Sequence, residues 1–478
     1  MGPVEPHTRR MSASFKRVLV ANRGEIAVRV IGACKKLGIE TVAAVSEADR
    51  DSLPARLATR AVCIGPARAS ESYLRPEILV TAALGTRCEA VHPGYGFLAE
   101  RAPFARMCKE AGIKFIGPSP DAIDAMGEKI AARRLAAEAG VPRVPGTDRI
   151  ESAAHALAIA REIGFPVMLK ASAGGGGRGI RIVRTETELA SAIDAAAAEA
   201  RAAFGDATVY LEKFIERAKH IEVQILADAH GNVVHLGERE CSVQRRYQKL
   251  IEEAPSPAVD AALRRELGLA ATELARRVGY EGAGTVEFVF DVDAGRYYFL
   301  EMNTRIQVEH PVTEMITGRD LVAEQIRIAE GAPISFSQDE ISFGGNAIEC
   351  RINAEDAEHD FAPRPGRLSA FAPPFGHDVR VDTHCFPGYV VPPFYDSLLA
   401  KLIVRGEDRA HAMQRMRAAL DAFTIEGVPT TIPFHRRMLD HADFRDGRVT
   451  TTWVERTLLS SSPASTGKGD HPKGAYRP

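Results

Sequence analysis

The sequence predicts a mixed α/β and α+β fold in three parts: an N-terminal doubly wound parallel-sheet domain, a small second α/β domain and a C-terminal mixed α/β domain. Three observations support this prediction. Strands and helices alternate at the start of the chain, a glycine run joins two strands in its middle, and strands dominate the remainder. The 478 residues are enough for about three domains. A hydrophobic share of 45% with 26% charged residues is ordinary for a globular protein.

The N-terminal part alternates strands with helices. An apolar strand at residues 16–21 and a loop at 22–25 precede apolar positions at helical spacing up to Gly38, and a second strand follows at 40–45. A strand, helix and strand within about thirty residues form a βαβ unit, which requires a parallel sheet. The same alternation continues at residues 61–64, 76–84, 90–92 and 114–116. We therefore expect one doubly wound α/β domain over residues 15–117.

Next we expect a helical linker over residues 118–141 and the small α/β domain over 142–214. The small domain should contain a strand, a glycine run, a second strand and an alanine-rich helix, at residues 166–170, 174–179, 180–183 and 186–203. Residues 215–460 are predicted to form the strand-rich C-terminal domain. Residues 1–14, which lack an apolar signal-peptide core, and the Ser/Pro/Gly-rich residues 461–478 are expected to be disordered tails.

Charge and cysteine content exclude several classes of protein. Lys and Arg number 61 and Asp and Glu number 63, a net charge of −2, so there is no global basic field for nucleic acid or an anionic membrane. No apolar run approaches the ~18 residues that a membrane span needs. The seven cysteines are scattered without a Cys-x-x-Cys pair, which argues against a disulfide framework and a structural zinc site. We expect a cytoplasmic protein that binds neither nucleic acid nor membranes.

The glycine-rich residues 174–179 satisfy Gly-x-Gly-x-x-Gly, but no helix follows them. A dinucleotide-binding fingerprint needs a helix N-terminus to hold the pyrophosphate, whereas the β-favouring residues 180–183 follow here. We interpret the segment as a flexible flap between two strands, whose backbone N–H groups can cover a phosphate. Lys170 at the end of the preceding strand supports this interpretation, and a mobile hairpin tip without a ligand is the alternative.

The most informative segment carries a polar functional group at every second position. Read as a strand, it places five such side chains on one face: Glu301, Asn303, Arg305, Gln307 and Glu309. A solvated edge strand is the alternative, although such strands usually carry Thr, Lys and Ser. Eight residue steps span about 26 Å, so one site can use both ends only if the chain turns near the middle.

A hairpin should place a second carboxylate beside Glu301. The strand 284–290 carries Glu287, and a short Asp/Gly turn at residues 291–295 joins it to the strand that carries Glu301. Two adjacent carboxylates repel each other unless they share a proton or a cation. With Asn303 as a third oxygen donor the set suits Mg²⁺, whereas no His or Cys stands nearby at the spacing of a zinc site.

Two further segments are rich in charged and amide side chains. Residues 238–249 contain Arg, Gln and Lys in a pattern that suits an oxyanion or a nucleotide. Residues 351–356 contain Arg, Asn, Glu and Asp, and taken alone they are better interpreted as a surface ion-pair loop.

Together these segments resemble biotin carboxylase, the ATP-grasp component of biotin-dependent carboxylases. The strongest match combines Glu301-Met-Asn-Thr-Arg-Ile-Gln-Val-Glu-His-Pro311 with Arg351-Ile-Asn-Ala-Glu-Asp356. Other matching stretches run in the family's order, at residues 21–26, 92–97, 126–129, 170–179, 238–249 and 395–397. The resemblance implies an N-terminal α/β domain, a hinged ATP-grasp lid domain and a C-terminal domain, with ATP held between two sheets.

The resemblance also implies roles for individual residues. ATP contacts at the phosphates, the adenine hinge and the ribose are implied for Lys129, Lys170, Gly175, Gly176, Gly177, Glu212, Lys213, His220 and Gln244. Metal binding is implied for Glu287, Glu301 and Asn303. Bicarbonate would be held by Lys249, Arg305, Gln307 and the backbone of Val308. Glu309 would be the base, and Arg351 would face the biotin ureido oxygen. The biotin side would be lined by Tyr95, Gly96 and Asp396.

The implied reaction is ATP- and bicarbonate-dependent carboxylation of biotin on a separate carrier protein through carboxyphosphate. It would be the first half-reaction of an acyl-CoA carboxylase of the acetyl- or propionyl-CoA type, with ATP and Mg²⁺ (Mn²⁺ as the alternative ion) and carrier-bound biotin. No Ala-Met-Lys-Met biotinylation motif and no transferase-sized region is found. We therefore expect the biotin carboxyl carrier protein and the carboxyltransferase on separate chains. The family also implies a homodimer.

Two alternatives stay open. Another ATP-grasp ligase, joining a carboxylate to an amine, would share the lysine and the metal-binding pair but has no evident need for Arg305 and Arg351. A non-catalytic nucleotide-binding scaffold is the second alternative, because Tyr247 stands where the family often has His. A tyrosine cannot carry protons at neutral pH as a histidine can.

Overall fold

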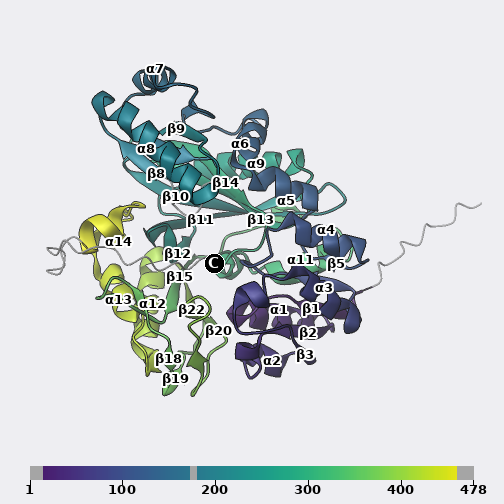
Figure 1. The fold of residues 1–478 in the computed structure, drawn as a ribbon. Coiled ribbons are helices and arrows are strands. Elements are labelled where there is room, and N and C mark those ends of the chain that lie inside the picture. Colours follow the sequence, from purple (N-terminus) through teal and green to yellow (C-terminus); the bar gives the residue numbers. More distant parts are fainter. Residues whose placement is uncertain (1–13, 173–179, 460–478) are drawn as a thin grey trace, which may run out of the picture.

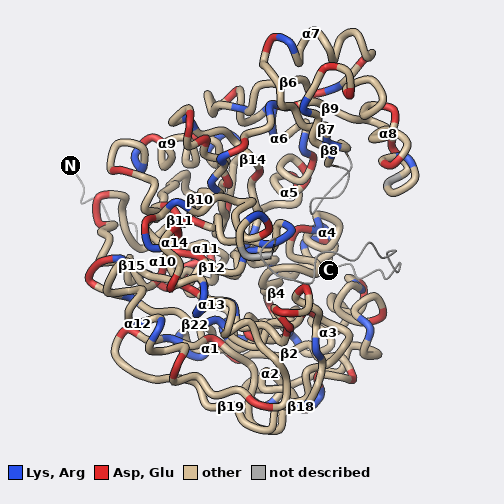
Figure 2. Tube along the Cα trace, turned by 90° about the vertical axis from the view of Figure 1, so that its left-hand side faces the viewer, with Lys and Arg blue, Asp and Glu red and all other residues tan. Residues whose placement is uncertain are grey.

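The computed structural model describes residues 14–172 and 180–459 of the chain (Figure 1). Three large sheets organise it, with five, four and eight strands. Figure 1 places the four-stranded sheet at the top of the molecule and the N-terminal sheet, drawn in purple, at the lower right. Charged residues of both signs are spread over the chain (Figure 2). In the described ranges, no helix is both long and apolar enough to cross a bilayer.

The N-terminal sheet is parallel, in the order β3-β2-β1-β4-β5, as the alternating pattern predicts. Its strands are β1 (Arg17–Val20), β2 (Glu40–Val45), β3 (Arg60–Cys63), β4 (Ala90–His92) and β5 (Lys114–Phe115). Its helices are α1 (Gly24–Lys36), α2 (Leu53–Leu57), α3 (Pro76–Gly85) and α4 (Ala102–Glu110). Val18 and Val20 pack with α1, whereas Leu19 packs with α3 and α4 on the other face, so the sheet is doubly wound. The loop expected at residues 22–25 is shorter, because α1 already begins at Gly24.

Two helices follow, α5 (Pro120–Gly127) and α6 (Lys129–Glu138), separated by the extended residue Glu128. The four-stranded sheet that comes next is antiparallel, in the order β6-β9-β7-β8. Its strands are β6 (Gly146–Thr147), β7 (Val167–Ala171), β8 (Ile180–Val183) and β9 (Val209–Lys213). The helices α7 (Ala153–Ile163) and α8 (Glu186–Phe204) share one apolar core with this sheet. The predicted glycine flap, residues 174–179, lies outside the described residues.

The largest sheet is antiparallel, in the order β14-β13-β10-β11-β12-β15-β22-β20. Its strands are β10 (Ala218–Ala227), β11 (Val233–Arg245), β12 (Gln248–Ala254), β13 (Gly282–Asp291), β14 (Arg296–Asn303), β15 (Asn346–Asn353), β20 (Val379–Thr383) and β22 (Leu398–Gly406). One face is apolar: α9 (Ala261–Arg277) packs on Val223 of β10, and α12 (Arg409–Ala422) packs on Cys350 of β15. The helix α10 (His310–Thr317) packs on Ala347, which points to the opposite face.

The other elements of this region are short or peripheral. The remaining helices are α11 (Leu321–Ala329), α13 (Ile432–Asp440) and α14 (Ala442–Arg445). Two-stranded ladders pair β16 (Glu355–Asp356) with β17 (Ala362–Pro363), β18 (Gly366–Arg367) with β21 (Val390–Val391), and β19 (Ala370–Ala372) with β23 (Thr424–Glu426). Short helical turns lie at Glu47–Asp49, Ala69–Glu71, Gln338–Glu340 and Val454–Leu459.

The strand predicted over residues 301–309 is wrong in its second half. β14 ends at Asn303, residues 304–308 turn, and Glu309 is the N-cap residue of α10. A proline in the first turn of α10, Pro311, fits a helix start because its ring fixes a helical φ and its missing N–H is not needed there. The five polar side chains therefore do not share one strand face. The turn instead brings Glu309 back over the sheet, which lets both ends of the segment serve one site.

The N-terminal sheet is joined to the large one by a shared core and a buried cation. Ile26 of α1 lies in one apolar cluster with Ile326 of α11. Arg23 Nε lies 2.9 Å from Asp49 Oδ2, and the Arg23 guanidinium sits 4.0 Å from the centroid of the Tyr395 ring. Because Tyr395 belongs to the segment before β22, this cation–π contact fastens the N-terminal domain to the C-terminal part.

Candidate active site

The candidate site lies where α10 begins, over the charged face of the eight-stranded sheet. In β10, His220, Glu222 and Gln224 alternate with apolar residues that pack into the core beneath α9. Glu287 of β13 stands directly opposite Glu222, and Glu301 of β14 stands directly opposite Glu287. The predicted hairpin pairing of Glu287 with Glu301 is therefore confirmed, and a row of carboxylates crosses three neighbouring strands.

Lys249, on β12, is the centre of the ion pairs in this site. Its Nζ lies 2.5 Å from Glu222 Oε2, 2.5 Å from Glu309 Oε1 and 3.1 Å from Glu287 Oε1. Burial would lower the pKa of this ammonium group, but the three carboxylates raise its pKa well above the usual value. Lys249 therefore stays protonated and joins acids from three separate segments of the chain.

Glu309 is buried at the start of α10 between two cations. Its Oε1 faces Lys249, and its Oε2 accepts a hydrogen bond from Arg351 Nη2 at 2.9 Å. Burial alone would raise the pKa of Glu309, but the cations Lys249, Arg351 and Arg239 together outweigh that effect, and the pKa lies below its usual value. The carboxylate is ionised at neutral pH and can accept a proton, as a general base must.

Arg351, on β15, is held between two acids. Its Nη2 lies 2.5 Å from Glu252 Oε1 and 2.9 Å from Glu309 Oε2. Burial raises the pKa of Glu252 to about 7, although Arg351 acts in the opposite direction. The side chain of Arg351 is 17% exposed, so it is not completely enclosed by the protein. A fixed cation that is still accessible can stabilise negative charge on a ligand.

Donors that suit a divalent cation gather on β10, β13 and β14. Ligand atoms of His220, Glu222 and Glu287 lie within 4.8 Å of one another. Burial would lower the pKa of His220, but the neighbouring Glu287 carboxylate raises it to about 9. With Glu301 directly across from Glu287, the carboxylate oxygens match the donors that Mg²⁺ takes in proteins. Asn303 Nδ2 donates to Glu287 Oε1 at 2.9 Å, so the amide lies beside the predicted ligands.

Arg305 and Gln307 lie on the turn between β14 and α10 and face different neighbours. Gln307 Nε2 donates to Glu287 Oε1 at 2.7 Å, so this amide reaches the acid cluster directly. Arg305 Nε pairs with Glu100 Oε2 at 2.8 Å, and Arg305 Nη2 donates to Asn303 Oδ1 at 2.9 Å. In this structure the guanidinium of Arg305 is bound by an acid of the N-terminal domain.

Three of the residues predicted to hold ATP lie on β7 and β9 of the small sheet, next to α6. Lys170 Nζ lies 2.6 Å from Glu212 Oε2, and Arg133 of α6 pairs with the same carboxylate. Lys213 Nζ donates to the carbonyls of Gly164 and Phe165 at 3.0 and 3.1 Å. Glu212 and Lys213 therefore tie β9 to its surroundings in this structure.

The other predicted ATP residues are placed as follows. Lys129 is the first residue of α6, and Gln244 is buried on β11 directly opposite Lys249. Gly175, Gly176 and Gly177 lie outside the described residues. Tyr247 occupies the β11–β12 turn with a φ of 64°, and 61% of its surface is exposed.

The predicted biotin side brings Tyr95 close to the site but leaves Asp396 at its rim. The hydroxyl of Tyr95 donates to Glu25 Oε1 of α1. Gly96 has a φ of +68°, a left-handed conformation that glycine adopts without strain. Asp396 is exposed and accepts a hydrogen bond from the Leu398 N–H at 3.0 Å.

Sequence reasoning missed three charged residues of the site, Glu100, Glu222 and Glu252, and gave no individual role to Arg239 within the segment 238–249. The fully buried guanidinium of Arg239 donates to five side chains, those of Glu222, Gln224, Thr285, Gln307 and Thr313. The alternation of His220, Glu222 and Gln224 was a usable signal, because polar residues at every second position mark one strand face. No local pattern marks Glu100, whose contact depends on how two distant segments pack.

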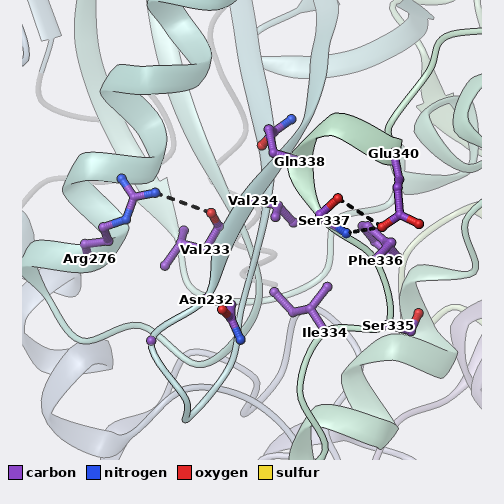
Figure 3. A pocket seen from close by; sticks show the side chains of 11 residues that line it. Asn232, Val233, Val234, Arg276, Ile334, Ser335, Phe336, Ser337, Gln338 and Glu340 are labelled. Atoms are coloured by element: carbon purple, nitrogen blue, oxygen red, sulfur yellow. Dashed lines mark hydrogen bonds between the residues drawn. The ribbon is translucent and has the colours of Figure 1, made fainter.

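A separate cavity of about 550 Å³ lies away from this cluster (Figure 3). It is lined by residues 231–234 around the start of β11, by Arg276 near the end of α9, and by residues 334–338 and Glu340. None of the predicted site residues that the structure describes lines it. Figure 3 shows Ser337 bound to Glu340 and Arg276 directed at the Val233 carbonyl, so these polar groups already have partners.

Comparison with known families finds three matches that follow one another along the chain. Residues 14–123 match the family "Biotin carboxylase, N-terminal domain". Residues 128–336 match "Carbamoyl-phosphate synthase L chain, ATP binding domain". Residues 349–456 match "Biotin carboxylase C-terminal domain".

Individual relatives match over nearly the whole chain. "Biotin carboxylase 1" of Bacillus subtilis is 54% identical over 442 residues, which is 92% of this chain and 98% of that protein. Among solved structures, the biotin carboxylase domain dimer of Hydrogenobacter thermophilus 2-oxoglutarate carboxylase, with MgADP, ADP and bicarbonate, superposes with a TM-score of 0.88. It is 51% identical and covers 93% of this chain and 98% of that chain. The biotin carboxylase part of a pyruvate carboxylase superposes with a TM-score of 0.83 at 50% identity, over 93% of this chain and 98% of that chain.

Proposed function

Because this chain belongs to the biotin carboxylase family of ATP-dependent ligases, we propose that it activates bicarbonate with ATP and carboxylates biotin on a separate carrier protein. The observation that carries the proposal is the ionised Glu309 held 2.5 Å from Lys249 and 2.9 Å from Arg351. A buried base between two cations suits a substrate that is itself an anion and must lose a proton. The relative solved with MgADP and bicarbonate supports the same pair of substrates.

In the first step Glu309 takes the proton of bicarbonate while the oxygen that loses it attacks the γ-phosphorus of ATP. An O–P bond forms, the bond between the β–γ bridging oxygen and the γ-phosphorus breaks, and ADP leaves, which gives carboxyphosphate. Lys249 offsets the negative charge of bicarbonate, and Gln307 can orient it by a hydrogen bond. Mg²⁺, when held by Glu287 and Glu301, neutralises charge on the phosphates.

In the second step carboxyphosphate breaks into CO₂ and phosphate, and the phosphate takes the proton of the biotin ureido nitrogen. That nitrogen then attacks CO₂. Arg351 would stabilise the negative charge that develops on the ureido oxygen, as a fixed donor does in an oxyanion hole. Its position beside Glu309 supports this role, because carboxyphosphate would then form within reach of biotin.

We also propose that the chain serves an acyl-CoA carboxylase of the acetyl- or propionyl-CoA type, with the carrier and the carboxyltransferase on separate chains. The relatives include proteins named for pyruvate and 2-oxoglutarate carboxylation, which supports the further proposal that the transferase partner, and not this chain, sets the acceptor. A homodimer is part of the proposal, supported by the Hydrogenobacter thermophilus domain, which was solved as a dimer.

The proposal is tested by measuring ADP release from purified protein. ADP release should require bicarbonate and should rise when free biotin is added. ADP release that depends instead on an amino acid, with no response to bicarbonate, would favour a carboxylate–amine ligase. ATP binding without any turnover would favour the nucleotide-binding scaffold.

A further inference from the structure

Lys401 is a buried cation that the proposed mechanism does not use. It lies on β22, and its side chain is 0% exposed. Its Nζ donates to the Val308 carbonyl at 2.8 Å and lies 3.1 Å from Glu25 Oε1 and 3.8 Å from Asp382 Oδ2. Because burying an ammonium group is strongly unfavourable unless it is well paired, these contacts explain how the lysine is accommodated.

The carbonyl that Lys401 holds belongs to the residue directly before Glu309. Val308 is the last residue of the turn after β14, and Glu309 opens α10. In the pairing of β15 with β22, Lys401 stands directly opposite Arg351. Two cations side by side on one sheet face therefore hold adjacent residues: Lys401 binds the backbone of Val308, and Arg351 binds the side chain of Glu309.

Lys401 also reaches the N-terminal domain. Glu25, near the start of α1, accepts a hydrogen bond from the Tyr95 hydroxyl through the same Oε1 that faces Lys401. A continuous chain of polar contacts thus runs from Tyr95 through Glu25 and Lys401 to the Val308 carbonyl. It joins the predicted biotin side to the segment that carries the base.

We propose that Lys401 is a positioning residue for carboxylation, which fixes the Val308–Glu309 segment against the sheet and links it to Tyr95. The inference rests on the proposed function. Lys401 would act through its neighbours, because its ammonium group holds the backbone of the residue directly before Glu309. Loss of its hydrogen bond would let the start of α10 shift, and small displacements of a reacting group reduce rates strongly.

The test is Lys401→Met, with ATP, bicarbonate and biotin varied separately. We expect kcat/KM for bicarbonate to fall by about 10- to 100-fold, since a displacement of about 1 Å has effects of this size. ATP affinity, measured by calorimetry, should stay within about twofold, because no predicted nucleotide contact involves Lys401.

A second variant separates positioning from folding. Glu349 interacts electrostatically with Lys401, and its carboxylate oxygens have no hydrogen-bond partner among the described residues. Lys401→Met with Glu349→Gln therefore replaces the cation and a neighbouring buried carboxyl by neutral side chains, so that Glu349 cannot be left charged without Lys401. The double variant should show the same loss of kcat/KM for bicarbonate as the single one.

The matched control is Lys219→Met. Lys219 is a second buried lysine, whose Nζ donates to Glu240 Oε1 at 2.7 Å and to the Val449 carbonyl at 3.0 Å, away from α10. The Lys219→Met variant should have a lower melting temperature than the wild type and an unchanged kcat/KM for bicarbonate. Wild-type kcat/KM in folded Lys401→Met protein, or an equal loss in Lys219→Met, would overturn the inference. A wild-type protein without bicarbonate-dependent ADP release would instead overturn the proposed function, and this inference with it.

Discussion

The role proposed for Glu309 depends on its two cationic neighbours. Lys249 keeps the pKa of this buried carboxyl below its usual value, so the base is ready at neutral pH. Glu309→Gln keeps the shape of the side chain and removes the proton acceptor. We expect bicarbonate-dependent ADP release to fall by about 10²- to 10⁴-fold, the usual contribution of a general base. A coupled ADP assay measures the rate, and calorimetry should show unchanged ATP binding.

The Glu309→Gln variant should fold, because each cation keeps another acid. Lys249 still pairs with Glu222 and Glu287, and Arg351 still pairs with Glu252. Glu358→Gln, at an exposed position of the same part of the chain, is the control and should behave as wild type. If Glu309→Gln releases ADP at the wild-type rate, another group accepts the proton.

At the scale of single residues, the sequence was most informative where functional groups follow one another closely. Glu287, Glu301 and Gln307 could be predicted because each lies in a short segment with several polar groups, and the structure brings all three to one cluster. Glu100 and Lys401 could not be predicted. Glu100 binds residues more than two hundred positions away, and Lys401 binds the carbonyl of Val308 more than ninety positions away, so no local pattern records these contacts.

At the scale of elements, the error in residues 301–309 has a clear cause. Polar groups at every second position imitate a strand, but here the second half of the alternation comes from a turn and the start of a helix. The proline at residue 311 was the available signal for a helix start. The apolar strand β2 lies where it was expected, because burial of five of its six residues fixes its limits. β8 also begins and ends where it was expected, although Val183 is its only buried residue.

The contact between α1 and α11 allows a prediction about stability and pH. Asp320, the N-cap of α11, lies 2.5 Å from Arg29 and 3.3 Å from Lys36, both on α1. Burial would raise the pKa of Asp320, but Arg29 outweighs it and the pKa falls to about 2. Asp320→Asn should lower the free energy of unfolding at pH 7 by about 1 to 2 kcal/mol, allowing for solvent screening.

The pH dependence follows from the direction of that shift. In the unfolded chain Asp320 has a pKa of about 3.9, above its folded value. Its stabilising effect is therefore complete above about pH 4 and is lost as the pH falls toward 2. Urea unfolding at pH 7 and pH 3 measures this, and the difference in unfolding free energy between the wild type and Asp320→Asn should fall to about half at pH 3, where the carboxyl of the folded protein is still mostly ionised. Asp121→Asn is the control, because this side chain is 95% exposed, and it should leave the free energy of unfolding unchanged at both pH values.

At the scale of the whole molecule, the sequence predicted the parallel N-terminal sheet and a strand-rich C-terminal part, but not how the strands of the large sheet pair. Alternating strands and helices indicate a parallel sheet because the pattern is local. In the eight-stranded sheet, by contrast, β12 pairs with β15. The residues that face each other in this pairing, Glu252 and Glu349, are nearly a hundred positions apart in the sequence. The attachment of the N-terminal domain through Arg23 and Tyr395 likewise depends on packing over the full length of the chain. The division into domains stays our proposal.

Nucleotide binding should stabilise the molecule as a whole, because the proposed site joins the small domain to the large sheet. A ligand present at 100 times its Kd raises the free energy of unfolding by about 2.7 kcal/mol, and this raises the melting temperature by several degrees. We expect this shift with ATP and Mg²⁺ and a much smaller one with ATP and EDTA. Differential scanning calorimetry measures both.

Glu287→Gln supplies the control for the metal in that experiment. This variant should remove most of the difference in melting temperature between ATP with Mg²⁺ and ATP with EDTA, because it removes a carboxylate from the predicted ion site. Equal melting temperatures for wild-type protein with ATP in Mg²⁺ and in EDTA would show that the row of acids on β10, β13 and β14 does not hold an ion that contacts the nucleotide.

The β12–β15 pairing also limits how such enzymes can exchange parts during evolution. The matched family segments end at residue 336 and resume at residue 349, which makes this interval look like a natural place for recombination. Across it, however, Glu252 on one side binds Arg351 on the other inside a single sheet. A hybrid protein made by joining two relatives within this interval would have an active site only if the residues that pair between β12 and β15 are compatible in the two relatives.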